Sequence, residues 1–272
     1  MKNNQSNKSR IIGLITDFGT KDYFVGLMKG VIRQIATQAE IIDITHDIPS
    51  FEILPACFVL EQSLLYFPSS SIFIVVVDPG VGTTRRILVV EYDRRFFIGP
   101  DNGILTPILC KTKKQVWSLE NSNFFLINGS STFEARDKMS PAAAFLARGI
   151  DPSEAGPIVS DYVLIDEFFP VGKENEIKGR IVYIDKFGNI ITNIPGEMID
   201  KQNKENGAAG YFITFGGTRI TARYETYGDA SSHTGPFMLT GSHGNIEIAM
   251  NKDSAANKLH AAINREIKVS FR

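Results

Sequence analysis

Hydrophobic and polar positions in the first part of the chain follow two different periods. Runs of apolar residues at 11–16 and 72–77 are typical of strands that are buried on both faces. Between such runs, apolar residues recur at helical spacing, as at Val25, Met28 and Ile32. Strands that alternate with helices predict an α/β domain with a mostly parallel sheet and flanking helices. The strands expected here are 11–16, 40–44, 72–77, 87–92 and 96–98.

Several helix boundaries are marked by particular residues. A helix is expected over 53–67, and a short helix is predicted to begin at Asp101. A further helix is predicted from Ser140 as the N-cap, Pro141 at the first helical position and Gly149 just beyond its end.

The pattern changes in the last third of the chain. The segment 170–178 is charged and rich in turn-forming residues, and we interpret it as a linker. Beyond it, short segments rich in β-branched and aromatic residues alternate with Gly, Asn and Asp turns, which predicts an all-β, barrel-like domain. Its expected strands include 180–184, 211–215, 219–224 and 246–250. We therefore expect an N-terminal α/β domain at 1–172 and a C-terminal β-barrel domain at 173–272.

Composition narrows the class of partner. Apolar residues make up 43% of the chain and charged residues 22%, which are ordinary values for a globular protein. The 29 basic and 30 acidic residues give a formal net charge of -1, so no global field favours nucleic acid or a membrane surface. No apolar run is long enough to span a bilayer, and residues 1–10 lack the apolar core of a signal peptide. These features predict a cytoplasmic protein with a small-molecule partner.

The sequence gives no signal for cysteine, serine-hydrolase, nucleotide-phosphate or metal chemistry. Cys57 and Cys110 lie in apolar segments and are expected to be buried thiols rather than a disulfide or a nucleophile. The sequence has no serine-hydrolase elbow, no dinucleotide loop and no Walker loop. The histidines show no metal-ligand spacing, so we expect no metal site. They are His46, His233, His243 and His260.

Three loops carry acidic residues that could form a site. Ligands of an open parallel sheet bind outside the carboxyl ends of its strands, and Asp17 ends the first strand. Its carboxylate can accept two hydroxyl groups at once. Asp22 follows in the same loop and could instead cap the next helix.

The other two loops combine acids with bases. Asp78 leaves a buried strand through a Pro-Gly turn, and Arg85 can pair with it across that turn, either in a site or as a surface salt bridge. Glu134 lies in a run of ionisable residues before the predicted helix at Ser140, where the alternative is a solvated rim. In that alternative Glu134 pairs only with Arg136 or Lys138.

Taken together, these loops resemble the S-adenosylmethionine hydroxide adenosyltransferase family, the hydrolytic relatives of fluorinating and chlorinating enzymes. The similar motifs of the first domain are ITDFGTKDYFVGLMKG at 15–30, IIDITHDIP at 41–49, VVDPGVGTTRR at 76–86, FIGPDNGILT at 97–106 and TFEARDKMSPAAA at 132–144. Those of the second are IDKFGNIITNI at 184–194 and GNIEIAMN at 244–251. Each motif is weak alone, but their common order makes the resemblance specific.

The resemblance implies a reaction and an assembly. Water or hydroxide would attack the 5′ carbon of the ribose of S-adenosylmethionine and release adenosine and methionine. S-adenosylmethionine is then the substrate, and no cofactor is expected. The fold implied is an α/β domain joined to a β-barrel domain. The chains would form a homotrimer with each site between the first domain of one subunit and the second domain of its neighbour.

Site residues follow from the matching motifs. In the first domain, Asp17 resembles the ligand of the ribose diol and Asp22 a contact to the methionine end of the substrate. Phe51 falls where the halogenating relatives place an aromatic wall against the ribose. In the second domain, the resemblance implies methionine-end contacts and an adenine clamp. The former are Asp185 and Ser242, and the latter Phe187 and Asn189.

The resemblance also bears on the attacking water. The hydrolytic enzymes surround it with Asp, Arg and His, and Asp78 and Arg85 match the first two. The halogenating relatives lack this Asp, so its presence favours water over halide. The family's histidine is replaced by Glu134, which we expect to be catalytic. Two neighbouring carboxylates would oppose an anion between them, so either one shares a proton or Arg85 and Arg136 offset their charge.

Two other functions fit the same features. A halide adenosyltransferase would use the same substrate with another nucleophile. A non-catalytic protein that binds S-adenosylmethionine or adenosine would fit the replaced histidine.

Overall fold

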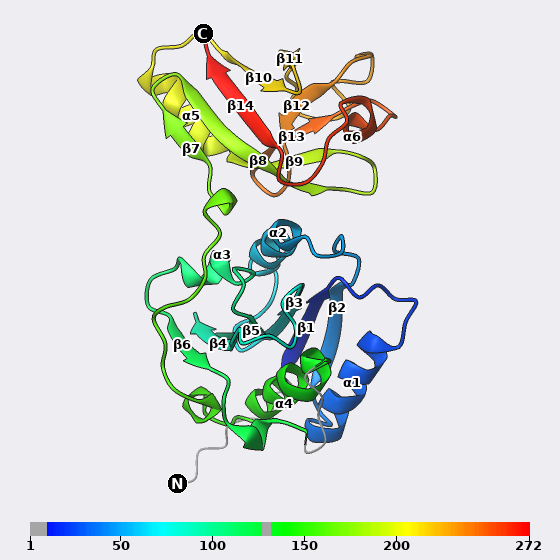
Figure 1. Cartoon of the computed structure of the whole chain (residues 1–272). Helices are drawn as coiled ribbons and strands as arrows, with labels where there is room; N and C mark the ends of the chain where they lie inside the picture. The colour runs from blue at the N-terminus through cyan, green and yellow to red at the C-terminus, as the bar shows by residue number, and fades with distance from the viewer. Residues whose placement is uncertain (1–9, 127–131) are drawn as a thin grey trace. The chain divides into compact units, whose positions relative to one another are not determined.

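The computed structural model describes residues 10–126 and 132–272 of the chain (Figure 1). The chain forms two compact units, one ending at Ile165 and the other spanning Asp166–Arg272. The sequence pattern placed this division between residues 172 and 173. Each unit has its own sheet and its own hydrophobic core.

The N-terminal unit has a mostly parallel six-stranded sheet in the order β2-β1-β3-β5-β4-β6. Strands β2, β1, β3 and β5 run parallel, whereas β4 is antiparallel to both β5 and β6. The strands are β1 Ile11–Thr16, β2 Glu40–Thr45, β3 Ile72–Val76, β4 Ile87–Tyr92, β5 Arg95–Pro100 and β6 Gln115–Ser118. The expected α/β class is confirmed, with an antiparallel edge added to it.

Helices bury both faces of this sheet. Along β3, Ile72 and Ile74 pack in a cluster with residues of α1 and α4, whereas Phe73 and Val75 pack with residues of α2 and α3. Figure 1 shows α1 and α4 on one side of the sheet and α2 on the other. Because both faces are covered, the strand is continuously apolar. The helices are α1 Phe24–Ile35, α2 Ile53–Ser63, α3 Thr106–Leu109 and α4 Ser140–Ala147.

Two helix starts differ from the prediction. The helix expected at Asp101 begins only at Thr106, because the carboxylate of Asp101 accepts hydrogen bonds from Arg86 and from the backbone N–H of Val163. Ser140 begins α4 but does not cap it. Its hydroxyl donates to the carbonyl of Ala135 at 2.7 Å, and a π-helical turn, Ala135–Met139, precedes the helix.

The C-terminal unit is an antiparallel, nearly closed barrel-like sheet, as the sequence predicted. Seven strands follow the order β11-β10-β14-β8-β9-β13-β12, and β7 pairs with β8. The strands are β7 Val171–Lys173, β8 Glu176–Ile184, β9 Ile190–Pro195, β10 Tyr211–Phe215, β11 Thr218–Ile220, β12 Phe237–Thr240, β13 Asn245–Ala249 and β14 Glu266–Phe271. Two helices accompany them, α5 Gly196–Glu205 and α6 Ala255–Lys258.

Two further expectations need correction. The segment 170–178 is not a linker, because Val171–Lys173 pairs with the start of β8 in a hairpin. Charged residues around a turn are compatible with either structure. Cys57 is buried as expected, but Cys110 is exposed.

In the described residues, no helix is both long enough and apolar enough to cross a membrane.

Candidate active site

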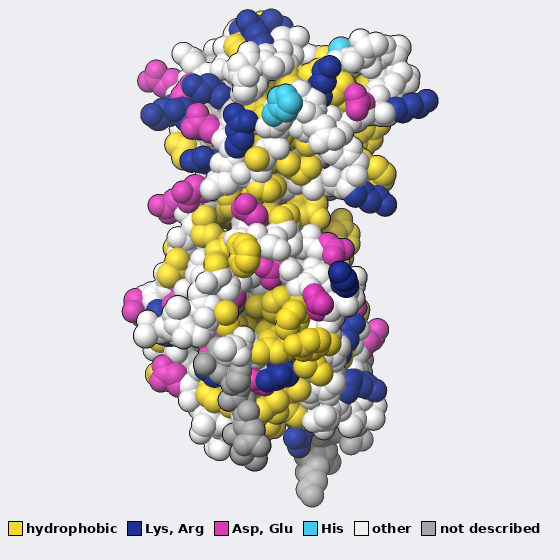
Figure 2. All heavy atoms as spheres, turned by 45° about the vertical axis from the view of Figure 1, so that its right-hand side comes forward, with side chains coloured by type: hydrophobic (Ala, Val, Ile, Leu, Met, Phe, Trp, Pro, Cys, Tyr) yellow, Lys and Arg dark blue, Asp and Glu magenta, His cyan; other side chains and the backbone are white. Residues whose placement is uncertain are grey.

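A cavity of about 320 Å³ opens in the N-terminal unit where β1 and β3 end. It combines aromatic side chains with three carboxylates. Its lining consists of Asp17, Phe18, Phe24, Ser50, Phe51, Val76, Asp78, Val81, Thr132, Phe133, Glu134 and Ala135. Figure 2 shows hydrophobic side chains gathered on a hollowed face of this unit, with acidic side chains beside them. The carboxyl ends of parallel strands are where such folds bind ligands.

Asp78 and Arg85 form a buried ion pair in this region. Asp78 Oδ1 accepts Arg85 Nε at 2.9 Å, and Asp78 Oδ2 accepts Arg85 Nη2. Their side chains are only 6% and 10% exposed, so the pair is not the surface salt bridge that the sequence also allowed. Burial opposes the charge of Arg85, but the hydrogen bonds and charges of Asp78 and Glu134 outweigh it and raise the pKa of the guanidinium.

Glu134 lies beside this pair. It is 5% exposed, and its Oε2 accepts a second hydrogen bond from Arg85 Nη2. Its other oxygen, Oε1, accepts Nζ of Lys138. Glu134 is therefore buried beside Asp78 rather than part of a solvated rim. It does pair with Lys138, as the rim interpretation expected, but not with Lys138 alone. Arg136 pairs with Asp137 instead, so Lys138 and not Arg136 joins Arg85 in offsetting the two carboxylates.

Asp17 enters the same cavity from the end of β1. Its Oδ2 accepts the backbone N–H of Phe51 at 3.1 Å. Burial raises the pKa of Asp17, the hydrogen bond from Phe51 lowers it, and the charge of Asp78 raises it, with a net rise. Phe51 is 71% exposed and lines the cavity. Asp22 is also exposed, but within the described chain it is not part of this lining, and the N-cap of α1 is Tyr23 rather than Asp22.

The loop that contains Asp17 is held in place by a buried histidine, His46. From the sequence, this residue was considered only as a possible metal ligand, and that role was rejected. His46 is 3% exposed, and its Nδ1 lies 2.8 Å from the hydroxyl of Thr16. Its Nε2 lies 3.0 Å from Asp43 Oδ1, and its carbonyl accepts the N–H of Gly19 at 2.8 Å. Side chain and backbone of His46 thus hold the residues on either side of Asp17.

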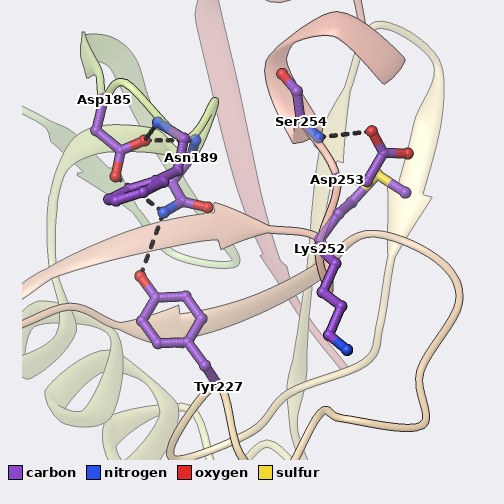
Figure 3. Close-up of a pocket in the computed structure, with 8 residues that line it drawn as sticks. Asp185, Asn189, Tyr227, Lys252, Asp253 and Ser254 are labelled. Atoms are coloured by element: carbon purple, nitrogen blue, oxygen red, sulfur yellow. Dashed lines mark hydrogen bonds between the residues drawn. The ribbon is translucent and has the colours of Figure 1, made fainter.

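The C-terminal unit has a separate pocket of about 750 Å³ (Figure 3). It is lined by Asp185, Phe187, Asn189, Tyr227, Met250, Lys252, Asp253 and Ser254. Asp185 Oδ1 accepts the backbone N–H groups of Phe187 and Asn189, at 2.8 and 2.9 Å. Asp185 Oδ2 accepts the side-chain amide of Asn189 at 2.9 Å. The carboxylate thereby organises the turn that presents Phe187, which is 68% exposed.

Two residues of this region, Tyr227 and Glu247, were not foreseen from the sequence. The hydroxyl of Tyr227 lies 3.5 Å from Asn189 Nδ2 and donates to the buried Glu247. Burial and then the hydrogen bond to Glu247 raise the pKa of Tyr227, so the phenol keeps its proton. Ser242 is exposed in the turn between β12 and β13 and is not among the residues that line the pocket.

An α/β unit with carboxylates at the ends of parallel strands, followed by an antiparallel barrel with its own pocket, defines a two-domain ligand-binding protein. Residues 12–156 match the SAM hydroxide adenosyltransferase N-terminal domain, and residues 179–268 match the C-terminal domain of the same family. The chain therefore belongs to the SAM hydroxide adenosyltransferase family.

Two relatives of similar sequence are named as hydrolases of S-adenosylmethionine, and one solved structure has a similar fold. The chain is 31% identical to the (R)-S-adenosyl-L-methionine hydrolase of Thermus thermophilus, over 92% of this chain and 95% of that protein. It is 36% identical to the enzyme of the same name from Methanocaldococcus jannaschii, over 70% of this chain and 68% of the relative. The crystal structure of an uncharacterised conserved protein from Thermotoga maritima superimposes with a TM-score of 0.85 at 33% identity, covering 95% of this chain and 99% of that one.

Proposed function

We propose that this protein hydrolyses S-adenosyl-L-methionine to adenosine and L-methionine by attack of water or hydroxide on the ribose 5′ carbon. The observation that carries the proposal is that Asp78 and Glu134, which line the same cavity as Asp17, are both paired with the guanidinium of Arg85. The identity of the substrate is inferred from the names of the hydrolase relatives. The name of these relatives specifies the R form, so that epimer is the expected substrate.

The chemistry requires little from the enzyme beyond a placed nucleophile. An oxygen–carbon bond forms at C5′ while the carbon–sulfur bond breaks, and the sulfonium sulfur keeps the electron pair and leaves as the neutral thioether of methionine. Bulk water has a pKa of about 15.7 and is a poor nucleophile, so the water must be oriented and must lose a proton. The leaving group is already activated by its charge, which is why we expect no cofactor.

Three side chains are suited to handle that water. Glu134 can accept its proton as general base and pass it to solvent. Asp78 can orient the water as a hydrogen-bond acceptor, and Arg85 can stabilise the developing hydroxide. The Nη1 atom of Arg85 is buried and has no hydrogen-bond partner among residues 10–126 and 132–272, so it remains available as a donor.

The remaining contacts are assigned by the same proposal. Asp17 binds the ribose diol and Phe51 packs against the ribose. In the C-terminal pocket, Phe187 and Asn189 hold the adenine. Asp185 acts by organising their turn, since all the hydrogen bonds described for its oxygens are internal to that turn.

The direct test is to incubate purified protein with S-adenosylmethionine and to separate the products by chromatography. Adenosine and methionine are expected, and in oxygen-18 water the adenosine should carry the label. Adenosine without label would refute attack by water. A halogenated adenosine formed in chloride buffer would identify a halide adenosyltransferase, and binding without turnover would identify a sequestering protein.

We further propose a cytoplasmic homotrimer in which the cavity of one chain and the pocket of a neighbour complete one site. The support is that each pocket contains only part of the expected set of substrate contacts. Mixing Asp17→Ala with Asn189→Ala protein under subunit exchange should restore some activity. No recovery despite demonstrated exchange would point to a site built within one chain.

A further inference from the structure

Arg85 carries one positive charge and can neutralise only one of the two carboxylates, Asp78 and Glu134. Asp78 and Glu134 both accept hydrogen bonds from the same guanidinium nitrogen, Arg85 Nη2. Their side chains are 6% and 7% exposed. With both carboxylates ionised, this group of three side chains would carry one excess negative charge. Burying an uncompensated charge is costly, and one carboxylate would take up a proton instead.

Lys138 supplies the missing positive charge. The π-helical turn Ala135–Met139 follows Glu134 directly and brings Nζ of Lys138 to Glu134 Oε1. The two oxygens of Glu134 are thus divided between two cations, Oε2 to Arg85 and Oε1 to Lys138. With Lys138 included, the cluster has two carboxylates and two cations.

No nearby cation described in the structure takes the same place. Arg136 is held by Asp137 through two hydrogen bonds of 2.5 and 2.8 Å. The other charged group of the cavity lining is Asp17, which adds negative charge and whose field reaches Asp78. Lys138 itself is placed by two contacts, because its ammonium also lies 5.3 Å from the ring centre of Phe125.

We propose that Lys138 is a positioning residue that supplies the counter-charge of Glu134 and orients its carboxylate as the base, and that its removal moves the acidic limit of activity. The inference rests on the proposed hydrolysis. Glu134 then acts as a pair with Lys138.

The first experiment compares pH profiles of kcat for wild type, Lys138→Met and Lys138→Arg on S-adenosylmethionine. In Lys138→Met the acidic limb should move to higher pH by about one unit or more, the usual effect of removing an opposite charge within about 4–6 Å. Lys138→Arg keeps the charge and should retain the wild-type limb. An unmoved limb in Lys138→Met, or an equal movement in both variants, would overturn the proposal.

A matched control separates the charge from the aromatic contact. Lys114 lies 5.6 Å from the ring centre of Tyr162, but its hydrogen bond goes to the backbone carbonyl of Lys111 rather than to a carboxylate. Lys114→Met should therefore leave the acidic limb in place. A movement as large as that of Lys138→Met would contradict the role assigned to the Glu134 contact.

A second measurement does not depend on catalysis. Thermal unfolding should show that Lys138→Met lowers Tm by a few degrees in the native sequence and by much less in a Glu134→Gln background, where no excess charge is left. Equal losses in both backgrounds would refute the charge pairing. If wild type forms no adenosine, the proposed function fails while this cycle still tests the pairing. Lys138 is 31% exposed, and Lys138→Gln makes the same charge change should the Met variant not fold.

Discussion

The N-terminal cavity and the C-terminal pocket hold their polar groups in different ways. In the cavity, ionised side chains from separate loops meet one another, as Asp78, Arg85 and Glu134 do. In the pocket, the carboxylate of Asp185 is engaged by N–H groups of its own turn, including the amide of Asn189. Charged side chains that face one another can stabilise charge that develops on a reacting group. A turn held by its own hydrogen bonds instead offers a rigid surface to a ligand. From this difference we expect reaction chemistry in the first region and substrate recognition in the second.

The largest expected effect is on turnover, from Glu134→Gln. This change keeps the shape of the side chain and removes the basicity, so kcat should fall by roughly 10²- to 10⁴-fold with much less effect on substrate affinity. Steady-state kinetics would measure both. Near-normal turnover would mean that Glu134 only balances charge and that Asp78 and Arg85 suffice.

The second prediction concerns recognition. Asn189→Ala removes an amide that is 7% exposed and held by Asp185 in the pocket. If this amide binds substrate, KM should rise by about 10- to 150-fold, the range for a lost hydrogen bond of about 1.5–3 kcal/mol, with a smaller change in kcat. Asn175→Ala, an exposed residue between β7 and β8, is the control. A fall in kcat equal to that of Glu134→Gln would break the division between the regions.

The third prediction sets two isosteric changes against each other. Asp185→Asn should lower stability by about 1–2 kcal/mol, because an amide nitrogen would face the amide of Asn189. Asp17→Asn should slightly raise it at pH 7. Burial raises the pKa of Asp17 above 3.8, so ionisation costs the folded state more than the unfolded state. That cost is present above the raised pKa and disappears as the pH falls toward 3.8.

Thermal unfolding of both variants between pH 4 and pH 7 would check these signs. The stability gained by Asp17→Asn should shrink as the pH falls. Asp185→Asn should be less stable than wild type at pH 7. Two losses of similar size at pH 7 would show that Asp17 is a structural carboxylate like Asp185.

The smallest effect is expected at Tyr227. Its hydroxyl donates to Glu247 and lies at the limit of hydrogen-bond distance from Asn189, so Tyr227→Phe should raise KM only a few-fold and leave kcat unchanged. His243 Nε2, 3.3 Å from Glu247 Oε2, would still face that carboxylate. A change in KM as large as that of Asn189→Ala would make the Tyr227 hydroxyl a direct recognition group.

Local patterns predicted the elements whose residues are chosen by burial. Apolar runs located β1, β4 and β10 with the bounds that the structure has. The helix start at Asp101 was wrong because its carboxylate is used by Arg86, a partner that lies elsewhere in the sequence. The segment 170–178 was misread because charge and turn residues do not distinguish a linker from a hairpin.

The site shows the same limit. The pairing of Asp78 with Arg85 was foreseeable because it closes one turn. The approach of Glu134 depends on how the sheet brings separate loops together, and only the resemblance to a known family indicated it. The link from Tyr227 to Glu247 was missed because it joins a loop to a neighbouring strand, and no local spacing signals such a contact.

The width of the C-terminal pocket is determined before any ligand arrives. A Cβ at Gly188 would lie 2.0 Å from Ser254 Oγ, and the carbonyl of Gly188 accepts the backbone N–H of Ala256 at 2.9 Å. The turn with Phe187 and the segment with Ser254 are therefore fastened to each other at a separation that only glycine permits. Redesign for a bulkier base should leave Gly188 intact and instead shorten Met250 or Lys252, which line the same pocket without closing that contact.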